Sequence, residues 1–366
     1  MSGTRALCFM RSHHAVVSSV LLVSMIIASC VVSPIRVESS WSYLNRAFGE
    51  LQAPAESVVT LIPSEEDTGS THLNALGITT SIDESQSLQD RIDDVVAQGG
   101  IAIINHPKFL CDVASMDLGC LTGYSGVEIY NAFVDVALRS EGYATDMLDA
   151  INTYRAEVGM DLIWGFAVDD AHRVEDLGRA YVVTKASHSD TDSIIASLRN
   201  GSFYSSTGAA IEDIKVVAHK EIVVTASEES IVTFIAKGGT IVHRTDQPSS
   251  SASYHVQGDE GYVRVEVDSL SGRAWSQPMK VDSTGIAHNP YAAKGRWLKG
   301  SIHCHTIESD GACTPRQVFD WCIENGYRFL DYGIFTVNEE PNWGLGKFKE
   351  SFGARGVLRD TFRLEL

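Results

Sequence analysis

Several familiar catalytic and binding patterns are missing from this chain of 366 residues. Its seven cysteines include no C-x-x-C pair, and their odd number indicates neither a disulfide framework nor a thiolate zinc site. No Walker or Rossmann glycine motif occurs, so the phosphate-binding loops of those nucleotide-binding proteins are not indicated. No Ser-His-Asp or Cys-His arrangement stands out as a nucleophilic centre.

Positive charge is also scarce, because 29 basic residues face 47 acidic ones and the formal net charge is -18. This balance disfavours a broad basic surface that would bind a nucleic-acid backbone. A hydrophobic content of 44% predicts a globular protein with at least one sizeable core.

One long uncharged run lies near the N-terminus. Arg5 and Arg11 precede the apolar residues 15–32, and Ile27–Cys30 resembles the sequence before a bacterial lipoprotein cysteine. We therefore expect residues 1–40 to be a signal peptide or membrane anchor of an exported or membrane-anchored protein. A buried strand and helix in a cytoplasmic protein, or sequence from before the true gene start, are the alternatives.

From 41 to 212 the chain alternates short apolar runs with helical spacing, which predicts an α/β fold with a mostly parallel sheet or barrel. The expected strands are 58–62, 73–78, 101–104, 127–130, 162–167 and 179–184. The expected helices are 85–98, 140–158 and 190–199. In such folds functional residues lie where strands end.

Candidate metal ligands follow several of these strands. Residues i and i+2 of a strand face the same side, so His303 and His305 in LKGSIHCHTIESDG can bind one ion. Other candidates at strand ends are Glu66 (beside Glu65), His106, and the pair Asp170 and His172. Asp169 competes with Asp170 but would point away in an extended segment. Two weaker candidates are His72 and Asp310.

Together these segments resemble the motifs of the PHP (polymerase and histidinol phosphatase) superfamily of metal-dependent phosphoesterases. The matching pieces are LKGSIHCHTIESDG, LIPSEEDTGSTHLNALGI, GGIAIINHP, GVEIYN, FAVDDAH and SLRNGSFYSSTG. The resemblance implies a distorted (β/α)7 barrel that holds two or three Zn, Mn or Fe ions at the C-terminal ends of its strands.

The resemblance also implies roles for individual residues. Asp170 and His172 match the terminal D-x-H pair and are the expected catalytic residues. The implied metal ligands are Glu66, which would bridge two ions, and His106, Asp170, His172, His303, His305 and Asp310.

The order of the motifs departs from that family. Its H-x-H motif opens the barrel and its D-x-H motif closes it, whereas here the closing motifs come first. The family's T-D-H motif should follow the strand near 330, yet residues 331–340 read DYGIFTVNEE and contain no histidine.

The segment between the motifs suggests an explanation. Residues 213–285 alternate in the manner of a small antiparallel β-sandwich. The predicted domains are therefore a partial PHP-like barrel lacking its first strands (41–212), this sandwich, and the truncated start of a second PHP-like barrel (289–366). We rank a fragment or mis-assembled product of a tandem array first, then a circular permutation, and third a barrel completed by another chain.

Two functions follow from this interpretation. The first is hydrolysis of phosphate monoesters or small phosphodiesters by metal-activated water, if a complete site assembles. The second is a non-catalytic exported binding or structural protein built on a degenerate PHP domain. Its contact residues would be Tyr254, Tyr262 and Trp275, although core packing accounts for each of them as well.

Overall fold

The computed structural model describes residues 59–109, 115–138, 142–307, 309–331, 336–337 and 340–341, and these form one compact unit that begins at Val59. The apolar run at 15–32 and the predicted leader at 1–40 lie outside these residues. Within the described ranges, no helix has both the length and the apolar character needed to cross a bilayer.

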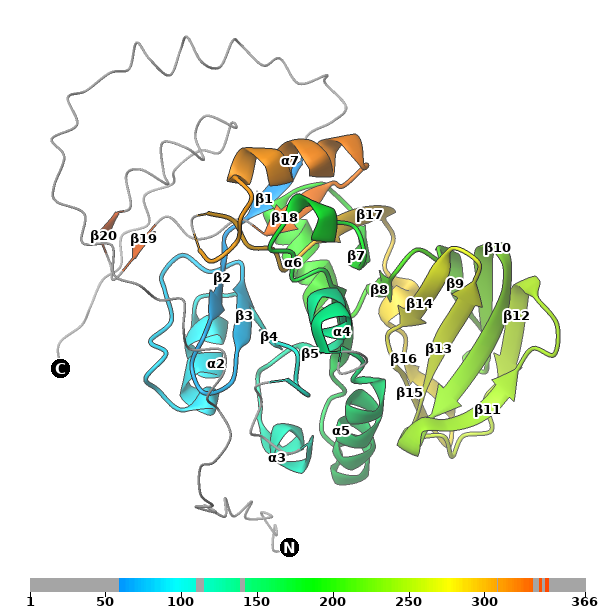
Figure 1. Cartoon of the computed structure of the whole chain (residues 1–366). Helices are drawn as coiled ribbons and strands as arrows, with labels where there is room; N and C mark the ends of the chain where they lie inside the picture. The colour runs from blue at the N-terminus through cyan, green and yellow to red at the C-terminus, as the bar shows by residue number, and fades with distance from the viewer. Residues whose placement is uncertain are drawn as a thin grey trace, which may run out of the picture. The chain divides into compact units, whose positions relative to one another are not determined.

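A five-stranded sheet carries most of the expected βα alternation (Figure 1). β2, β3 and β4 are antiparallel neighbours, while β4, β5 and β6 are parallel and buried throughout. Its strands are β2 (Ser64–Asp67), β3 (Leu73–Leu76), β4 (Ile101–Ile104), β5 (Gly126–Asn131) and β6 (Trp164–Val168). The intervening helices are α2 (Leu88–Ala97), α3 (Ser115–Cys120), α4 (Ala132–Leu138) and α5 (Thr145–Val158).

A second sheet joins segments from both ends of the described chain. β1 and β17 each run parallel to β18, and β17 pairs with β7 in antiparallel fashion. The elements are β1 (Thr60–Ile62), the 3-10 turn η1 (Val174–Asp176), β7 (Tyr181–Ala186), α6 (Thr191–Arg199), β8 (Phe203–Ser206), β17 (Arg296–Ser301), α7 (Pro315–Glu324) and β18 (Phe329–Asp331). Two short strands, β19 (Thr336–Val337) and β20 (Glu340–Pro341), pair with each other.

Apolar packing explains why the late strands join the early ones. Ile62, Val182, Leu298 and Phe329 come from β1, β7, β17 and β18, and all belong to one buried cluster. Gly300 of β17 allows β17 and β18 to lie this close, because a Cβ atom at this position would clash with the Phe329 ring. The described part of 289–366 therefore contributes β17 and β18 to this sheet.

The α/β class is confirmed, but the mostly parallel sheet is not. Both sheets are mixed, and no closed barrel forms among the residues that the structure describes. β6 packs beside β7 and β8, yet no ladder of hydrogen bonds joins the five-stranded sheet to the second one there.

Residues 211–288 are antiparallel β structure, as the alternation predicted. The long strand β10 belongs to two layers, because its first half pairs with β9 and β12 and its second half with β11 and β13. The strands are β9 (Ile211–Val217), β10 (Glu221–Ala236), β11 (Thr240–Arg244), β12 (Ser249–His255), β13 (Tyr262–Ser269), β14 (Gly272–Ser276), β15 (Met279–Asp282) and β16 (Gly285–His288). The 3-10 turns η2 (Lys237–Gly239) and η3 (Pro290–Ala292) complete this part. β14 pairs with β8, which makes one layer continuous with the second sheet.

Candidate metal centre

Backbone hydrogen bonds hold the two most informative motifs side by side. The amide of Asp170 donates to the carbonyl of His303 at 3.1 Å, and the amide of His305 donates to the carbonyl of Ala171 at 2.8 Å. The H-x-H segment follows β17 and the D-x-H segment follows β6. The chain thus brings together two motifs that lie far apart in the sequence.

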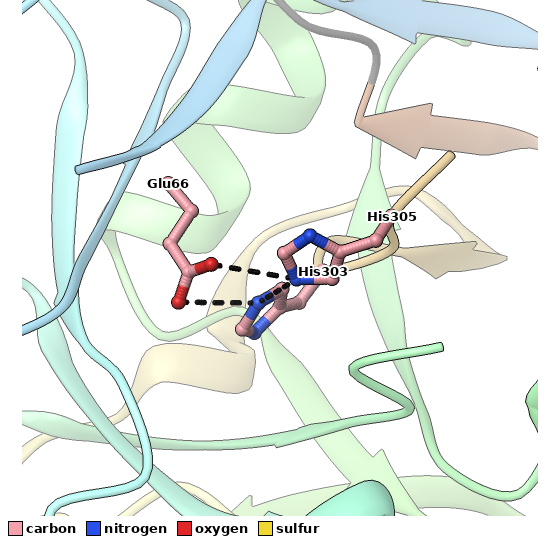
Figure 2. Close-up of side chains that lie close together, drawn as sticks. All are labelled: Glu66, His303 and His305. Carbon is pink, nitrogen blue, oxygen red and sulfur yellow. Dashed lines mark hydrogen bonds and ion pairs between the residues drawn. The ribbon is translucent and has the colours of Figure 1, made fainter. Parts of the chain in front are cut away.

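Four side chains of these motifs and of β2 converge on one point. His303 Nε2 and His305 Nε2 are 3.1 Å apart, and Asp170 Oδ1 lies 3.3 Å from the first and 3.0 Å from the second. The oxygens of Glu66 lie 3.5 Å from His303 Nε2 and 3.4 Å from His305 Nε2 (Figure 2). Donor atoms about 2.1 Å from a tetrahedral ion are about 3.4 Å from one another, so this spacing fits a shared cation.

Two further groups of potential ligands overlap with this centre. Glu66 also lies near His72 and His106, at 3.0 and 3.6 Å from their closest ring nitrogens. Asp170 and His305 form a third group with His172. The groups share Glu66 and His305, so the candidate ion positions adjoin one another.

Each of the main imidazoles is oriented by a contact at its other nitrogen. This is the usual arrangement of metal-binding histidines, because an acceptor at Nδ1 fixes the tautomer and leaves the lone pair of Nε2 free for the ion. The contacts are His303 to Glu128 Oε1 at 2.7 Å, His305 to Asp310 Oδ1 at 2.9 Å, His106 to the carbonyl of Phe109 at 2.9 Å and His172 to the carbonyl of Asp170 at 2.9 Å.

Glu128 is the functional residue that the sequence reasoning missed. It is 1% exposed in β5, and Oε2 accepts from the amide of His106 at 2.7 Å and from Asn131 Nδ2 at 3.0 Å. Asn131 also donates to Asp170 Oδ2 at 3.0 Å. An acidic residue inside the strand GVEIYN was the available signal, since a buried carboxylate needs partners.

The backbone is strained at two of the candidate ligands. His106 and Asp170 have backbone φ angles of 25° and 51°, values that residues other than glycine rarely adopt. Strain of this kind persists where the surrounding structure fixes the chain, and it gathers at functional sites. Here it turns each side chain toward the centre directly after a buried strand.

Burial and opposite charges act against each other at the centre. Burial disfavours the charged form of His303, yet Asp170, Glu128 and Glu66 together raise its pKa well above the usual value. Burial likewise opposes the carboxylate of Asp170, but His303 and His305 hold its pKa below the ordinary range. The pKa of Glu66 is lowered in the same way, mainly by His303 against the effect of burial.

Asp170 Oδ1 provides a direct test of whether a cation fits. This atom is buried and accepts no hydrogen bond from the residues that the structure describes. Buried carboxylate oxygens are normally satisfied by a donor or a metal ion. Together with the Nε2 atoms beside it, the orphaned oxygen fits a divalent cation.

The remaining candidates lie around a cavity of about 720 Å³ whose walls include all the ligand groups described above. Asp310 contacts the outer nitrogen of His305 and has a side chain that is 72% exposed, so it orients a ligand at the rim.

Cys304 points from between the two histidines toward Asp331, with Sγ 3.1 Å from Oδ1. Asp169 points away, as expected, and accepts from the amides of Gly178 and Ala180.

The aromatic residues of the second functional hypothesis are largely in the core. Tyr262 and Trp275 are 0% exposed, and the hydroxyl of Tyr254 donates to Glu260 at 2.8 Å. No surface for a partner forms from these three side chains.

Comparison with known proteins gives one match. A family model described as PHP-associated matches residues 165–203, which span β6 to β8 and include Asp170 and His172. No curated protein and no solved structure matches the chain. The match supports a PHP-related domain.

Proposed function

We propose that this chain is a metal-dependent phosphoesterase that hydrolyses phosphate monoesters or small phosphodiesters. The observation that carries the proposal is that carboxylate oxygens of Glu66 and Asp170 each lie within 3.0 to 3.5 Å of the Nε2 atoms of His303 and His305. The PHP-associated match at 165–203 is compatible with it.

The donor set indicates which ions would bind. His303, His305 and Asp170 would hold one ion, Glu66 would bridge, and His106 and His172 would serve the neighbouring positions. Mixed imidazole and carboxylate donors suit Zn, Mn or Fe better than Ca. Bound divalent ions would supply a water molecule of lowered pKa and would stabilise negative charge on the phosphate oxygens.

The chain's own residues would orient the metal-binding imidazoles and transfer protons. The hydrogen bonds of Glu128 and Asp310 fix the rings of His303 and His305, so little reorganisation is needed when a phosphate binds. His172 lies nearer the solvent, with Nε2 3.5 Å from Asp310 Oδ2 and a side chain that is 21% exposed. His172 would serve either as a ligand of the neighbouring ion or as the group that takes up a proton from water and returns one to the leaving oxygen, because its Nε2 cannot do both at once.

The test measures metal content and hydrolysis together, with p-nitrophenyl phosphate and bis(p-nitrophenyl) phosphate as substrates. We expect stoichiometric transition metal in the purified protein, loss of turnover on chelation, and a decrease of about 100-fold or more in His106→Ala and Asp170→Ala. His188→Ala is the matched control, because His188 is exposed and lies outside the cavity.

A protein that binds no transition metal at micromolar concentrations would rule the proposal out. Equal activity in Asp170→Ala and His188→Ala would do the same, even where metal is present.

A further inference from the structure

The charge of the cavity wall restricts which phosphate esters it can accept. Five carboxylates line the cavity, namely those of Glu65, Glu66, Asp170, Asp310 and Asp331. Among the described residues of this lining none is lysine or arginine. Lys108 follows His106 closely in sequence, but its ammonium group pairs with Asp146 at 2.7 Å and is not part of the wall.

A substrate's second negative charge therefore meets no lysine or arginine side chain among the residues that the structure describes in this wall. Phosphate-binding sites normally place arginine or lysine against the non-bridging oxygens, and the benefit grows with the charge of the phosphate. A monoester carries two charges near neutral pH, whereas a diester carries one. The charge of the cavity wall thus favours binding of a diester over binding of a monoester.

Two phenylalanine rings lie at different ligand groups of the same cavity. The Phe133 ring stacks on His172 with centroids 4.4 Å apart, and the Phe109 ring meets the edge of His106 at 5.6 Å. His172 belongs to the group around Asp170, and His106 to the group around Glu66. Each side of the centre therefore offers an aromatic surface, and a diester has two organic substituents to contact them.

Phe133 is held firmly in this position. It lies in the first turn of α4, and its amide donates to the carbonyl of Asp169 at 3.1 Å. The side chain of Asn131 caps the same turn through the amide of Val134 at 3.0 Å. The ring is thus fixed relative to the D-x-H segment.

We propose that the substrate is a monoanionic phosphodiester with a flat apolar substituent that packs against Phe133. This inference rests on the proposed function. In the reaction the oxygen of water forms a new bond to phosphorus, the bond between phosphorus and one ester oxygen breaks, and a proton from the water ends on that leaving oxygen. The products are an alcohol and a phosphate monoester.

The test uses two probes that cannot be hydrolysed, because all their organic groups are attached through carbon. Diphenylphosphinate is a monoanion with two rings, and phenylphosphonate is a dianion with one ring at pH 8. Isothermal titration of the zinc-loaded protein should give at least about tenfold tighter binding of diphenylphosphinate. In Phe133→Ala the affinity for diphenylphosphinate should fall about tenfold. Dimethylphosphinate, a control anion of the same charge without a ring, should bind as before.

Two further variants keep the result interpretable. Phe133→Leu preserves most of the volume in case the alanine variant does not fold, and it should lose part of the same affinity. Val136→Ala is the control on α4, because Val136 is 62% exposed and lies outside the cavity.

Equal or tighter binding of phenylphosphonate would overturn the inference, and so would an unchanged affinity for diphenylphosphinate in both Phe133 variants. These binding results are independent of turnover. If neither p-nitrophenyl ester is hydrolysed, the proposed function fails, whereas hydrolysis accompanied by a preference for the phosphonate refutes the diester alone.

Discussion

At the scale of single residues, the candidate centre depends on a carboxylate that binds no ion in our proposal. Glu128 contacts His303 Nδ1, the amide of His106 and the side chain of Asn131, which in turn donates to Asp170. Three candidate ligands are therefore oriented through one buried side chain. Removing such an orienting group typically costs metal affinity without removing a ligand.

We predict that Glu128→Gln lowers zinc affinity by about 10- to 100-fold. The amide keeps the volume of the carboxylate but replaces one acceptor with a donor, so it cannot accept from all three partners. Competition with a chelating dye measures the affinity, and the exposed Glu175→Gln is the control. Unchanged affinity in Glu128→Gln would show that His303 and His106 are positioned without it.

At the scale of elements, charged groups also fix a connection far from the centre. Glu260 is 4% exposed in the turn between β12 and β13, and it accepts from the amides of Gln257 at 2.6 Å and Gly258 at 2.8 Å. Burial opposes its charge, but these bonds and that of Tyr254 leave the pKa of Glu260 below its ordinary value. Its contribution to stability is therefore present above the ordinary pKa and disappears as the pH falls through the lowered one.

Glu260→Gln should lower the free energy of unfolding by about 1.5 kcal/mol at pH 7, because hydrogen bonds to a charged acceptor are lost. The difference from the wild type should shrink as the pH falls through the lowered pKa of Glu260, because the wild-type carboxyl group then becomes protonated. Urea unfolding at several pH values measures both quantities. Asp259→Asn, one residue earlier and exposed, should show no comparable loss. A difference that does not vary with pH would contradict the assignment.

Elements inside the α/β part could be predicted from the sequence because their signals are local. IAII was expected as a strand at 101–104 and forms β4 with those bounds, and α6 begins at Thr191 after Asp190 accepts from the amide of Ser193. Strand direction could not be predicted. β3 is antiparallel to both of its neighbours, although helix α2 separates β3 from β4 in the sequence, so a helix between two strands did not make them parallel.

The candidate site was predictable as a set of residue types and not as an arrangement. Each ligand follows a short apolar strand, and that pattern identified Glu66, His106 and Asp170. The contact between Asp170 and His303 depends instead on pairing between β17 and β7, a long-range event that no local pattern encodes. Glu128 was missed because it lies inside a strand, whereas the candidates were sought where strands end.

At the scale of the whole molecule, β17 and β18 connect the two ends of the described chain. β18 lies between β1 and β17, so strands from the start and the end of the unit share one sheet and one apolar cluster. The antiparallel β segment of 211–288 lies between them in sequence without separating them in space. Although the motif order differs from the family pattern, the D-x-H and H-x-H segments lie side by side.

This arrangement predicts the effect of ending the chain at residue 292. The truncated protein lacks β17 and β18, which uncovers Ile62 and Val182, and it lacks both histidines of the H-x-H motif. We expect loss of cooperative unfolding and of zinc binding. Removing two central strands exposes apolar side chains whose burial stabilises the fold, and the net stability of a domain is only a few kcal/mol. Circular dichroism during urea unfolding and zinc titration measure the two effects.

The full-length double variant His303→Ala with His305→Ala separates the two contributions of this segment. It retains both strands, so it should unfold cooperatively while binding zinc poorly. If the truncated chain instead unfolded cooperatively with the stability of the full-length protein, β17 and β18 would belong to a separate body. The ligands would then not share a centre.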